Sequence, residues 1–246
     1  MDVGEHIEAL RREGELLAAA AERTDFDAPI PTCPGWSMRD LLRHIGDVHR
    51  WAAAHVAERR TEAIGREELT EIAGPLPEDP ALIEWFRLGH RRLVRTLESA
   101  DPDTQCWSFL PAPSPVAFWA RRQAHETGIH RADAESPGGS LTPFPAAFAV
   151  DGIDELLFGF LGRPTDEEGG EAPRTLALRA TDGPGEWRVR IGVDRVHPTK
   201  EGDGADCSVA GTASDLHLLL WNRRGADGLR VEGDGSLLTF WRDHVQ

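Results

Sequence analysis

The sequence predicts an α+β chain in which a helix bundle precedes a smaller domain of strands and helices. Amphipathic helical patterns dominate the first 138 residues, whereas the short alternating runs typical of strands appear only afterwards. The segment Ser136-Pro-Gly-Gly-Ser140 lies where the pattern changes and is typical of a linker. We therefore expect two domains, residues 1–138 and residues 139–246.

Four amphipathic helices are expected in the first domain. Ser37 and Asp40 have the spacing of a helix N-cap and its capping-box partner, and Pro80 suits the first turn of a helix. The expected helices cover residues 3–22, 37–59, 79–99 and 116–135. Such helices predict a bundle, and bundle cores commonly hold metal ions between facing helices.

Shorter elements are expected in the second domain. An apolar helix over residues 146–161 precedes alternating runs at 175–180 and 186–193, which Asp182-Gly-Pro-Gly185 separates. A strand over 206–211 leads into a leucine-rich helix that begins at Thr212 and ends near residues 222–225. A last strand at 229–232 precedes a helix over 235–244. We expect a small, mainly antiparallel sheet with a helix packed on it.

The charge of the chain argues against several kinds of partner. A formal net charge of −15 disfavours binding to a nucleic-acid backbone or an anionic membrane surface. No apolar run approaches the roughly 20 residues that cross a bilayer. The first residues lack the basic and apolar pattern of a signal peptide. We therefore expect a cytoplasmic protein whose partners are small molecules.

Glu126 and His130 are the strongest candidates for chemistry. Residues four apart on a helix share a face, so this carboxylate and imidazole can reach one divalent metal ion. The run is not a zincin motif, because His125 and His130 are five apart and point roughly 140° away from each other. An exposed helix-stabilising pair is the alternative. Glu126 lies between Ala124 and Ile129, however, and a carboxylate buried there needs a partner.

A further ligand is expected from the second helix. His44 lies beside an apolar face at helical spacing, about two turns into that helix, where a side chain can enter the interior of a bundle. His49 is five residues further on and points elsewhere. We therefore expect His44, rather than His49, to meet Glu126 and His130. A hydrogen-bonded core histidine is the alternative role for His44.

Two stretches of the chain resemble one known family. The first resembles the metal-binding DinB-like four-helix domain of mycothiol-dependent maleylpyruvate isomerase-like proteins, through Pro34-Gly-Trp-Ser37, His44 and Glu126-x3-His130-Arg131-x-Asp133. The second resembles the sterol-carrier-like C-terminal domain of the same proteins, through the run from Val209 to Arg223. The resemblance covers nearly the whole chain and includes the order of the domains.

The resemblance implies a Zn²⁺ ion held by His44, Glu126 and His130, with an open position for water or substrate. It also implies mycothiol, a low-molecular-weight thiol, as the nucleophile, because zinc stabilises a thiolate at neutral pH. In the isomerisation the thiolate adds to an activated alkene, the bond rotates and the thiol leaves. The same apparatus can transfer the thiol to an electrophile, so an isomerase or a thiol S-transferase is expected.

Other residues have more than one expected role. Asp133 is expected to be structural, although it can also orient a ligand, and the role of Arg131 stays open. We expect His49 and Arg50 to face solvent. In the resembled isomerase an arginine of the second domain contributes to substrate binding. Arg223 and Arg224 are candidates by position, and the alternative is that they complement a helix dipole.

The cysteines suggest no site of their own. Cys33, Cys106 and Cys207 are far apart and form no C-x-x-C pair, so neither a disulfide framework nor a thiolate zinc site is expected. Cys33 lies beside Pro34 and is expected to be an ordinary loop thiol.

Two further functions are compatible with the sequence. One is a metal-dependent hydrolase in which zinc activates water, which predicts turnover without added thiol. The other is a non-catalytic protein whose second domain binds an apolar ligand, which predicts an apolar cavity there. Ligand type also leaves nickel or iron possible in a site of two histidines and a carboxylate.

Overall fold

The computed structural model describes residues 1–161, 173–192, 196–200 and 202–244. The chain divides into two units, Met1–Thr142 and Pro143–Gln246. The division follows Thr142 rather than residue 138. The reason is that the backbone amide and the hydroxyl of Thr142 both donate to the Glu135 carboxylate, which keeps this segment with the first unit.

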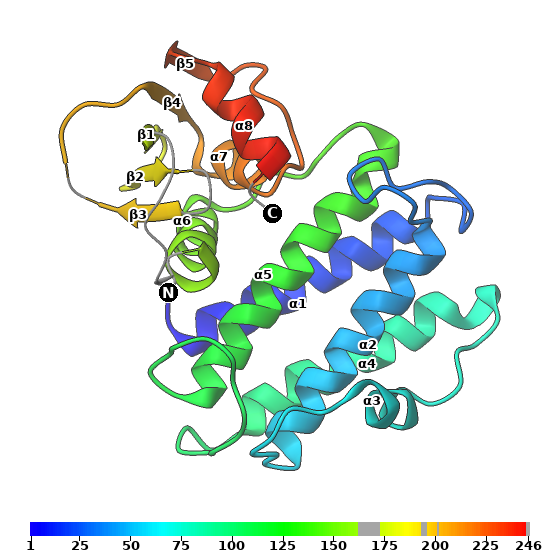
Figure 1. Cartoon of the computed structure of the whole chain (residues 1–246). Helices are drawn as coiled ribbons and strands as arrows, with labels where there is room; N and C mark the ends of the chain where they lie inside the picture. Colours follow the sequence, from blue (N-terminus) through cyan, green and yellow to red (C-terminus); the bar gives the residue numbers. More distant parts are fainter. Residues whose placement is uncertain (162–172, 193–195, 201, 245–246) are drawn as a thin grey trace. The chain divides into compact units, whose positions relative to one another are not determined.

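Four long helices form the first unit: α1 (Val3–Ala21), α2 (Met38–Ala57), α4 (Asp79–Ser99) and α5 (Pro115–Glu135). Ser37 caps α2 and forms the expected capping box with Asp40. Asp2 caps α1 and forms a capping box with Glu5, whereas Ser114 caps α5 through its side-chain oxygen alone. Helix α5 packs along α1, and α2 packs along α4 (Figure 1).

Helix α5 is buried along almost its whole length, unlike the other three helices. Its amphipathic partners present one apolar face each, such as Leu41, Leu42 and Ile45 of α2, all fully buried. Helix α5 instead carries polar and charged side chains into the interior: Arg122, Gln123, His125, Thr127, His130, Arg131, Asp133 and Glu135. Buried polar groups need partners, so α5 is where a functional site is expected.

A short fifth helix, α3 (Arg66–Ala73), was not predicted. None of its residues is buried, so it has no apolar stripe from which a helical period can be recognised. A single 3₁₀ turn, Ser136–Gly138, follows α5.

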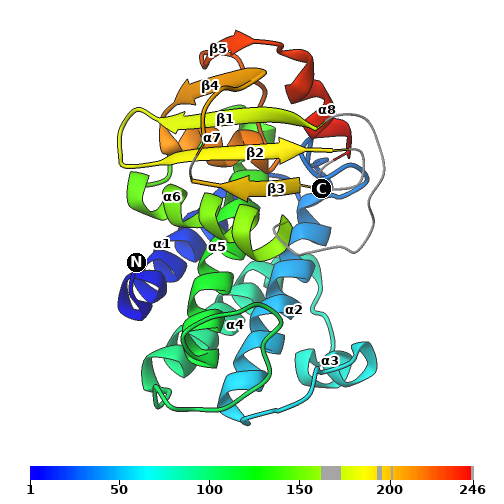
Figure 2. The same cartoon turned by 60° about the vertical axis from the view of Figure 1, so that its left-hand side comes forward.

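The second unit contains a five-stranded sheet, as Figure 2 shows, in the order β3-β2-β1-β4-β5. Helix α6 (Ala146–Asp154) precedes the strands in the chain and continues as a π-helical segment, Glu155–Leu161. Helix α7 lies between β4 and β5 in the chain, and α8 follows β5. The remaining elements are β1 (Arg174–Ala180), β2 (Glu186–Ile191), β3 (Val196–Thr199), β4 (Cys207–Gly211), α7 (Ala213–Leu220), β5 (Arg230–Gly233) and α8 (Ser236–His244).

The sheet is mainly antiparallel, as predicted, because among the described strands only β1 and β4 pair in parallel. Strand β3 was not predicted, since its four residues include Pro198, which interrupts a strand pattern. The strand expected over 186–193 ends at Ile191, and Val193 lies outside the described residues. Alternation sends Leu176, Leu178 and Val209 to the buried face of the sheet, which packs on α7.

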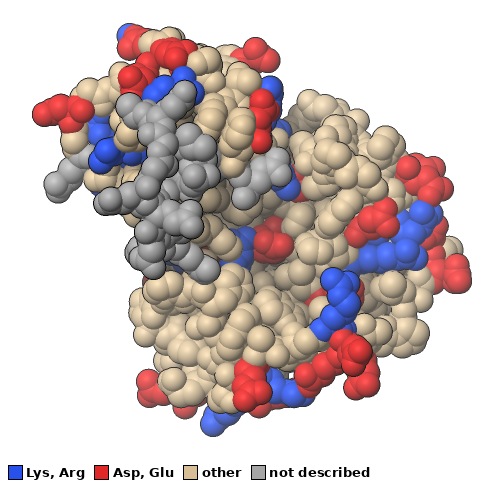
Figure 3. All heavy atoms as spheres, viewed as in Figure 1, with Lys and Arg blue, Asp and Glu red and all other residues tan. Residues whose placement is uncertain are grey.

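The charges are distributed over the surface. On the face shown in Figure 3, acidic side chains lie interspersed with arginines. Within the described residues, no helix is both long enough and apolar enough to cross a membrane.

Candidate metal centre

His44, Glu126 and His130 meet between α2 and α5. Each offers one ligand atom, and the three atoms lie within 4.8 Å of one another. Glu126 Oε1 is 3.3 Å from His130 Nε2 and 3.6 Å from His44 Nε2. One carboxylate oxygen therefore faces both imidazole nitrogens. The sequence brought two of these residues together by spacing, and helix packing adds the third.

The spacing of these atoms fits a divalent metal. In a tetrahedral site with bonds of about 2.0–2.1 Å, neighbouring ligand atoms lie about 3.3–3.4 Å apart. The separations of 3.3 and 3.6 Å are close to that value. The longer separation, between His44 Nε2 and Glu126 Oε1, exceeds the usual length of a hydrogen bond. Two imidazoles and one carboxylate are also a donor set that zinc uses in catalytic sites.

Asp133 fixes the ring of His130. His130 Nδ1 lies 2.9 Å from Asp133 Oδ2, and an ionised carboxylate only accepts, so Nδ1 donates. This leaves Nε2 unprotonated on the side of Glu126 when the ring is neutral. Thr32 Oγ1 in turn donates to Asp133 Oδ1 at 2.6 Å. Such a carboxylate behind a metal-ligating histidine orients the ring and raises its basicity. The orienting role that the sequence left as the second choice for Asp133 thus matches its contacts.

Arg122 holds the other oxygen of Glu126. Arg122 Nη2 donates to Glu126 Oε2 at 2.8 Å, and the arginine side chain is almost fully buried. The guanidinium therefore leaves Oε1 to the two imidazoles. Sequence reasoning missed Arg122, although it precedes Glu126 by one helical turn on the same face, which is a detectable signal.

The ionisable groups of the site are electrostatically coupled. Burial raises the pKa of Glu126, but His130, His44 and Arg122 favour the carboxylate more strongly and hold that pKa well below its usual range. Burial lowers the pKa of His130, whereas Asp133, Cys33 and Glu126 favour its protonated form and hold that pKa well above its usual range. The carboxylates of the site thus favour positive charge at His130, and a metal ion bound there would have to displace that proton.

Trp36 forms an aromatic wall of the site. Its ring stacks on His130 with the ring planes 13° apart, and it meets the edge of His44 with centroids 4.9 Å apart. His44 keeps 38% of its side chain exposed and Glu126 keeps 25%. The centre is therefore open to small molecules from the His44 side.

Cys33 lies closer to the site than its sequence context predicts. Its sulfur forms a second compact group with ligand atoms of His130 and Asp133. The prediction of an ordinary loop thiol is therefore incomplete. No signal in the sequence pairs Cys33 with residues about a hundred positions later, because only the packing of the loop before α2 against α5 brings them together.

His49 and Arg50 are buried, so the prediction that they face solvent is wrong. His49 is fully buried, and its Nε2 lies 2.9 Å from Thr127 Oγ1. The Arg50 guanidinium lies 3.7 Å from the Trp85 ring centroid and donates to the carbonyl of Trp85. Burial lowers the pKa of Arg50 to about 10. Helix α2 contacts both α4 and α5, so it is covered on two sides. His49 and Arg50 are therefore buried although they lie outside its apolar stripe.

Arg131 has a structural position. Its side chain is fully buried, and it donates to Glu13 of α1 and Glu135 of α5 at 2.8 Å each. His125 is also buried and has an edge contact with the ring of His6. Neither residue belongs to the group of three around Glu126.

Arg223 and Arg224 lie after α7 in the second unit. Arg224 forms an ion pair with Asp215 in the first turn of α7 and donates to the carbonyls of Gly225 and Asp227. Arg223 Nη1 donates to the carbonyl of Trp221 at 2.8 Å. Both arginines thus have local partners, which favours the structural alternative, and their role toward substrate stays a prediction.

Family models match two segments of this chain. The family model of the mycothiol maleylpyruvate isomerase N-terminal domain matches residues 7–135. That of the MDMPI C-terminal domain matches residues 147–239. No curated protein matches the chain.

Two solved structures have the same fold. One is a crystal structure of the mycothiol-dependent maleylpyruvate isomerase, with 16% sequence identity and a TM-score of 0.63. The match covers 94% of this chain and 93% of that one. The other is a histidine-to-alanine mutant of the same isomerase, with the same identity, coverage and TM-score. The two-domain match and the arrangement of helices and sheet agree: this chain belongs to the mycothiol maleylpyruvate isomerase family.

Proposed function

We propose that this chain is a zinc-dependent enzyme that uses mycothiol as cofactor or co-substrate, in the class of maleylpyruvate isomerases and thiol S-transferases. The observation that carries the proposal is the position of Glu126 Oε1, which faces the Nε2 atoms of both His44 and His130 at distances suited to one metal ion. Membership of the family supports the choice of a thiol as the reacting partner.

Three protein ligands leave a coordination position for a small molecule. A zinc ion bound there supplies Lewis acidity and stabilises a thiolate at neutral pH. The residues around it set its geometry: Arg122 holds one oxygen of Glu126, and Asp133 fixes the tautomer of His130. The flat ring of Trp36 limits the approach of water from one side and offers an apolar surface to a substrate.

Metal content tests the first half of the proposal. We expect near-stoichiometric zinc in the purified protein by elemental mass spectrometry, and its loss in His44→Ala, Glu126→Ala and His130→Ala variants that keep their helical circular dichroism. His197→Ala is the matched control, because His197 is exposed on β3, and it should retain the metal. A folded wild type that takes up no metal when zinc is supplied would refute the proposal.

Thiol dependence tests the second half. With maleylpyruvate as the probe substrate, we expect turnover only when mycothiol is added and only in variants that retain zinc. A range of electrophiles then separates an isomerase from a thiol S-transferase, since only the latter consumes the thiol. Turnover without any thiol would instead support the metal-dependent hydrolase.

A binding function for the second unit has one observation in its favour. A hollow of about 300 Å³ lies between α7, β5 and α8, and apolar side chains predominate in its lining, among them Leu219, Leu220, Leu238 and Trp241. This volume is at the lower end of small-molecule sites. If the protein is an apolar-ligand carrier, a fatty-acid probe should bind equally to the wild type and to His130→Ala.

A further inference from the structure

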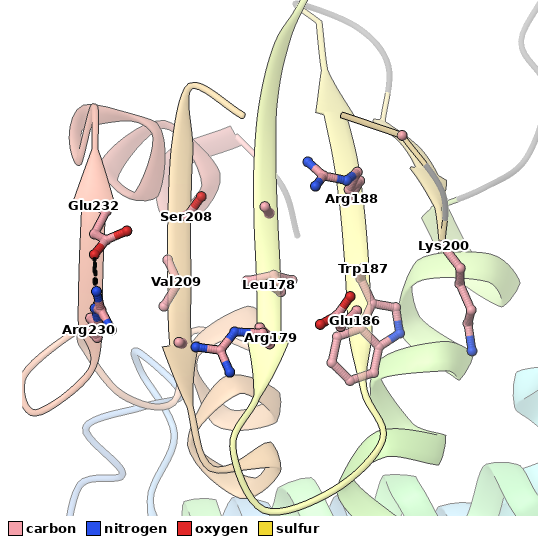
Figure 4. Close-up of a pocket in the computed structure, with 13 residues that line it drawn as sticks. Leu178, Arg179, Glu186, Trp187, Arg188, Lys200, Ser208, Val209, Arg230 and Glu232 are labelled. Carbon is pink, nitrogen blue, oxygen red and sulfur yellow. Dashed lines mark hydrogen bonds and ion pairs between the residues drawn. The ribbon is translucent and has the colours of Figure 1, made fainter. Parts of the chain in front are cut away.

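The solvent-facing side of the sheet in the second unit is hollowed. The hollow has a volume of about 350 Å³ and is lined by residues of β1, β2, β4 and β5 (Figure 4). Its floor consists of the short side chains of Ala177, Ser208 and Ala210. Longer side chains rise on both sides of this floor, so the hollow follows from the alternation of small and large residues across the strands.

The register of the sheet places two arginines around this floor. Ala177 of β1 lies opposite Arg188 of β2 on one side and opposite Ser208 of β4 on the other. Arg179, two residues along β1, is a diagonal neighbour of Arg188, and such neighbours have Cβ atoms roughly 7–8 Å apart. The two side chains belong to adjacent strands and lie on the same face of the sheet, as Figure 4 shows.

These two arginines lack acidic partners. Among the residues that the structure describes, Arg179 has no hydrogen bond or ion pair, and Arg188 donates only to the carbonyl of Gly204. The other cations of the lining are neutralised, since Arg230 pairs with Glu232 and Lys200 with Asp154. In a chain with a net charge of −15, two unpaired guanidiniums on one concave surface are a local exception.

We propose that this hollow binds a small organic molecule that carries two anionic oxygen groups, carboxylate or phosphate. A guanidinium fork matches such a group with two parallel hydrogen bonds, so Arg179 and Arg188 can each take one. The hydroxyl of Ser208 has no side-chain partner among the described residues and supplies a further hydrogen bond from the floor. The volume suits a molecule of this size.

The negative charge of Glu186 should weaken the binding of an anionic ligand in this hollow. It lies opposite Arg179 in the register, on the same face of the sheet. Among the described residues its carboxylate forms no ion pair with Arg179, but its negative charge lowers the local positive potential. The lining contains no histidine or cysteine, so the hollow is a binding site without acid–base or thiol chemistry. The inference does not depend on the zinc centre.

Titration of the ¹⁵N-labelled full-length protein with succinate and with inorganic phosphate tests the proposal. We expect saturable shifts of the Ala177 and Ser208 amide resonances with succinate. Arg179→Gln and Arg188→Gln should each weaken binding about tenfold or more, since each removes a charge-assisted contact. Glu186→Gln should tighten it. Saturation by both anions would support the proposal for carboxylates and phosphates alike, whereas saturation by succinate alone would restrict the ligand class to dicarboxylates.

Arg190→Gln is the matched control. Arg190 is exposed on the same strand and face as Arg188 and does not line the hollow, so the variant makes the same charge change outside the site. It should leave the affinity for succinate unchanged, as should His130→Ala. The proposal is overturned if neither anion gives saturable shifts, or if Arg190→Gln weakens binding as much as Arg179→Gln does.

Discussion

At the scale of single residues, the centre depends on how the two oxygens of Glu126 are divided. Oε2 accepts from Arg122, and Oε1 faces His44 and His130. His130 is held in the same way, with Nδ1 on Asp133 and Nε2 toward Glu126. Glu126 and His130 therefore each have one atom that is held by a neighbouring side chain and one that is directed at the centre, which is the arrangement that preorganises a metal site.

Asp133→Asn should weaken zinc binding about 10- to 100-fold, because the neutral amide no longer raises the basicity of His130. Competition with a chromogenic chelator measures the affinity. Cys33→Ser is the paired variant, since Cys33 contacts the same histidine and aspartate. If zinc lies with His44 and Glu126, Cys33→Ser leaves the affinity nearly unchanged. A large loss in Cys33→Ser would place the metal in the group of Cys33, His130 and Asp133 instead.

His55 should make the stability of the first unit depend on pH. Its ring stacks on Trp119 and packs against the tilted ring of Trp107, and neither ring nitrogen has a hydrogen-bond partner among the described residues. Burial lowers the pKa of His55 to about 4. In the unfolded chain histidine titrates near pH 6.5, so between these values the unfolded state binds the extra proton. Stability is therefore complete above about pH 6.5 and falls as the pH drops toward 4.

His55→Phe keeps a flat ring and removes this titration. Between pH 7.5 and pH 5, the wild type should lose about 2 kcal/mol more unfolding free energy than the variant does. Urea denaturation at the two pH values measures both losses, and the comparison cancels the contributions of the other buried histidines. Equal losses in the two proteins would contradict the prediction.

At the scale of elements, α5 departs most from an ordinary bundle helix. Glu126 and His130 project from it toward α2, and Arg131 projects toward α1, so polar side chains extend from different faces of the helix. The regular apolar stripes of α1, α2 and α4 were sufficient to predict those helices. Helix α5 was predicted over residues 116–135, and its polar interior became interpretable only with the partners of each side chain.

Arg131→Met should destabilise the first unit by about 3–5 kcal/mol, because it removes the buried guanidinium that pairs with both Glu13 and Glu135 and leaves Glu13 with only the partly exposed Arg12. Arg11→Met is the control, since Arg11 pairs with Glu98 on the surface, where such a pair contributes at most about 1 kcal/mol. Urea unfolding at neutral pH compares the two. Similar small losses in both variants would show that the buried network contributes little.

At the scale of the whole molecule, each of the two units carries a different candidate site. The three ligand residues, Arg122 and Asp133 all lie within Met1–Thr142. The hollow with its unpaired arginines lies within Pro143–Gln246. The proposed metal binding and the proposed anion binding thus belong to separate units of the chain.

A fragment of residues 1–142 should fold and bind zinc with the affinity of the full chain, because it contains every ligand and every residue that orients one. Zinc should also raise its melting temperature, as binding to the folded state alone requires. The same fragment with His130→Ala is the control and should show neither effect. A helical fragment that fails to bind zinc would show that the second unit contributes to the centre.

The sequence by itself determined the order of domains, the long helices, the N-cap Ser37 with its capping-box partner Asp40, and the pairing of Glu126 with His130. These features depend on residues that are close in the chain. Tertiary structure decided which more distant groups join them. Thr32, Cys33 and His44 reach α5 only through helix packing, and the burial of His49 and Arg50 depends on two neighbouring helices at once. Likewise, the register of the strands, not their composition, placed Arg179 diagonal to Arg188.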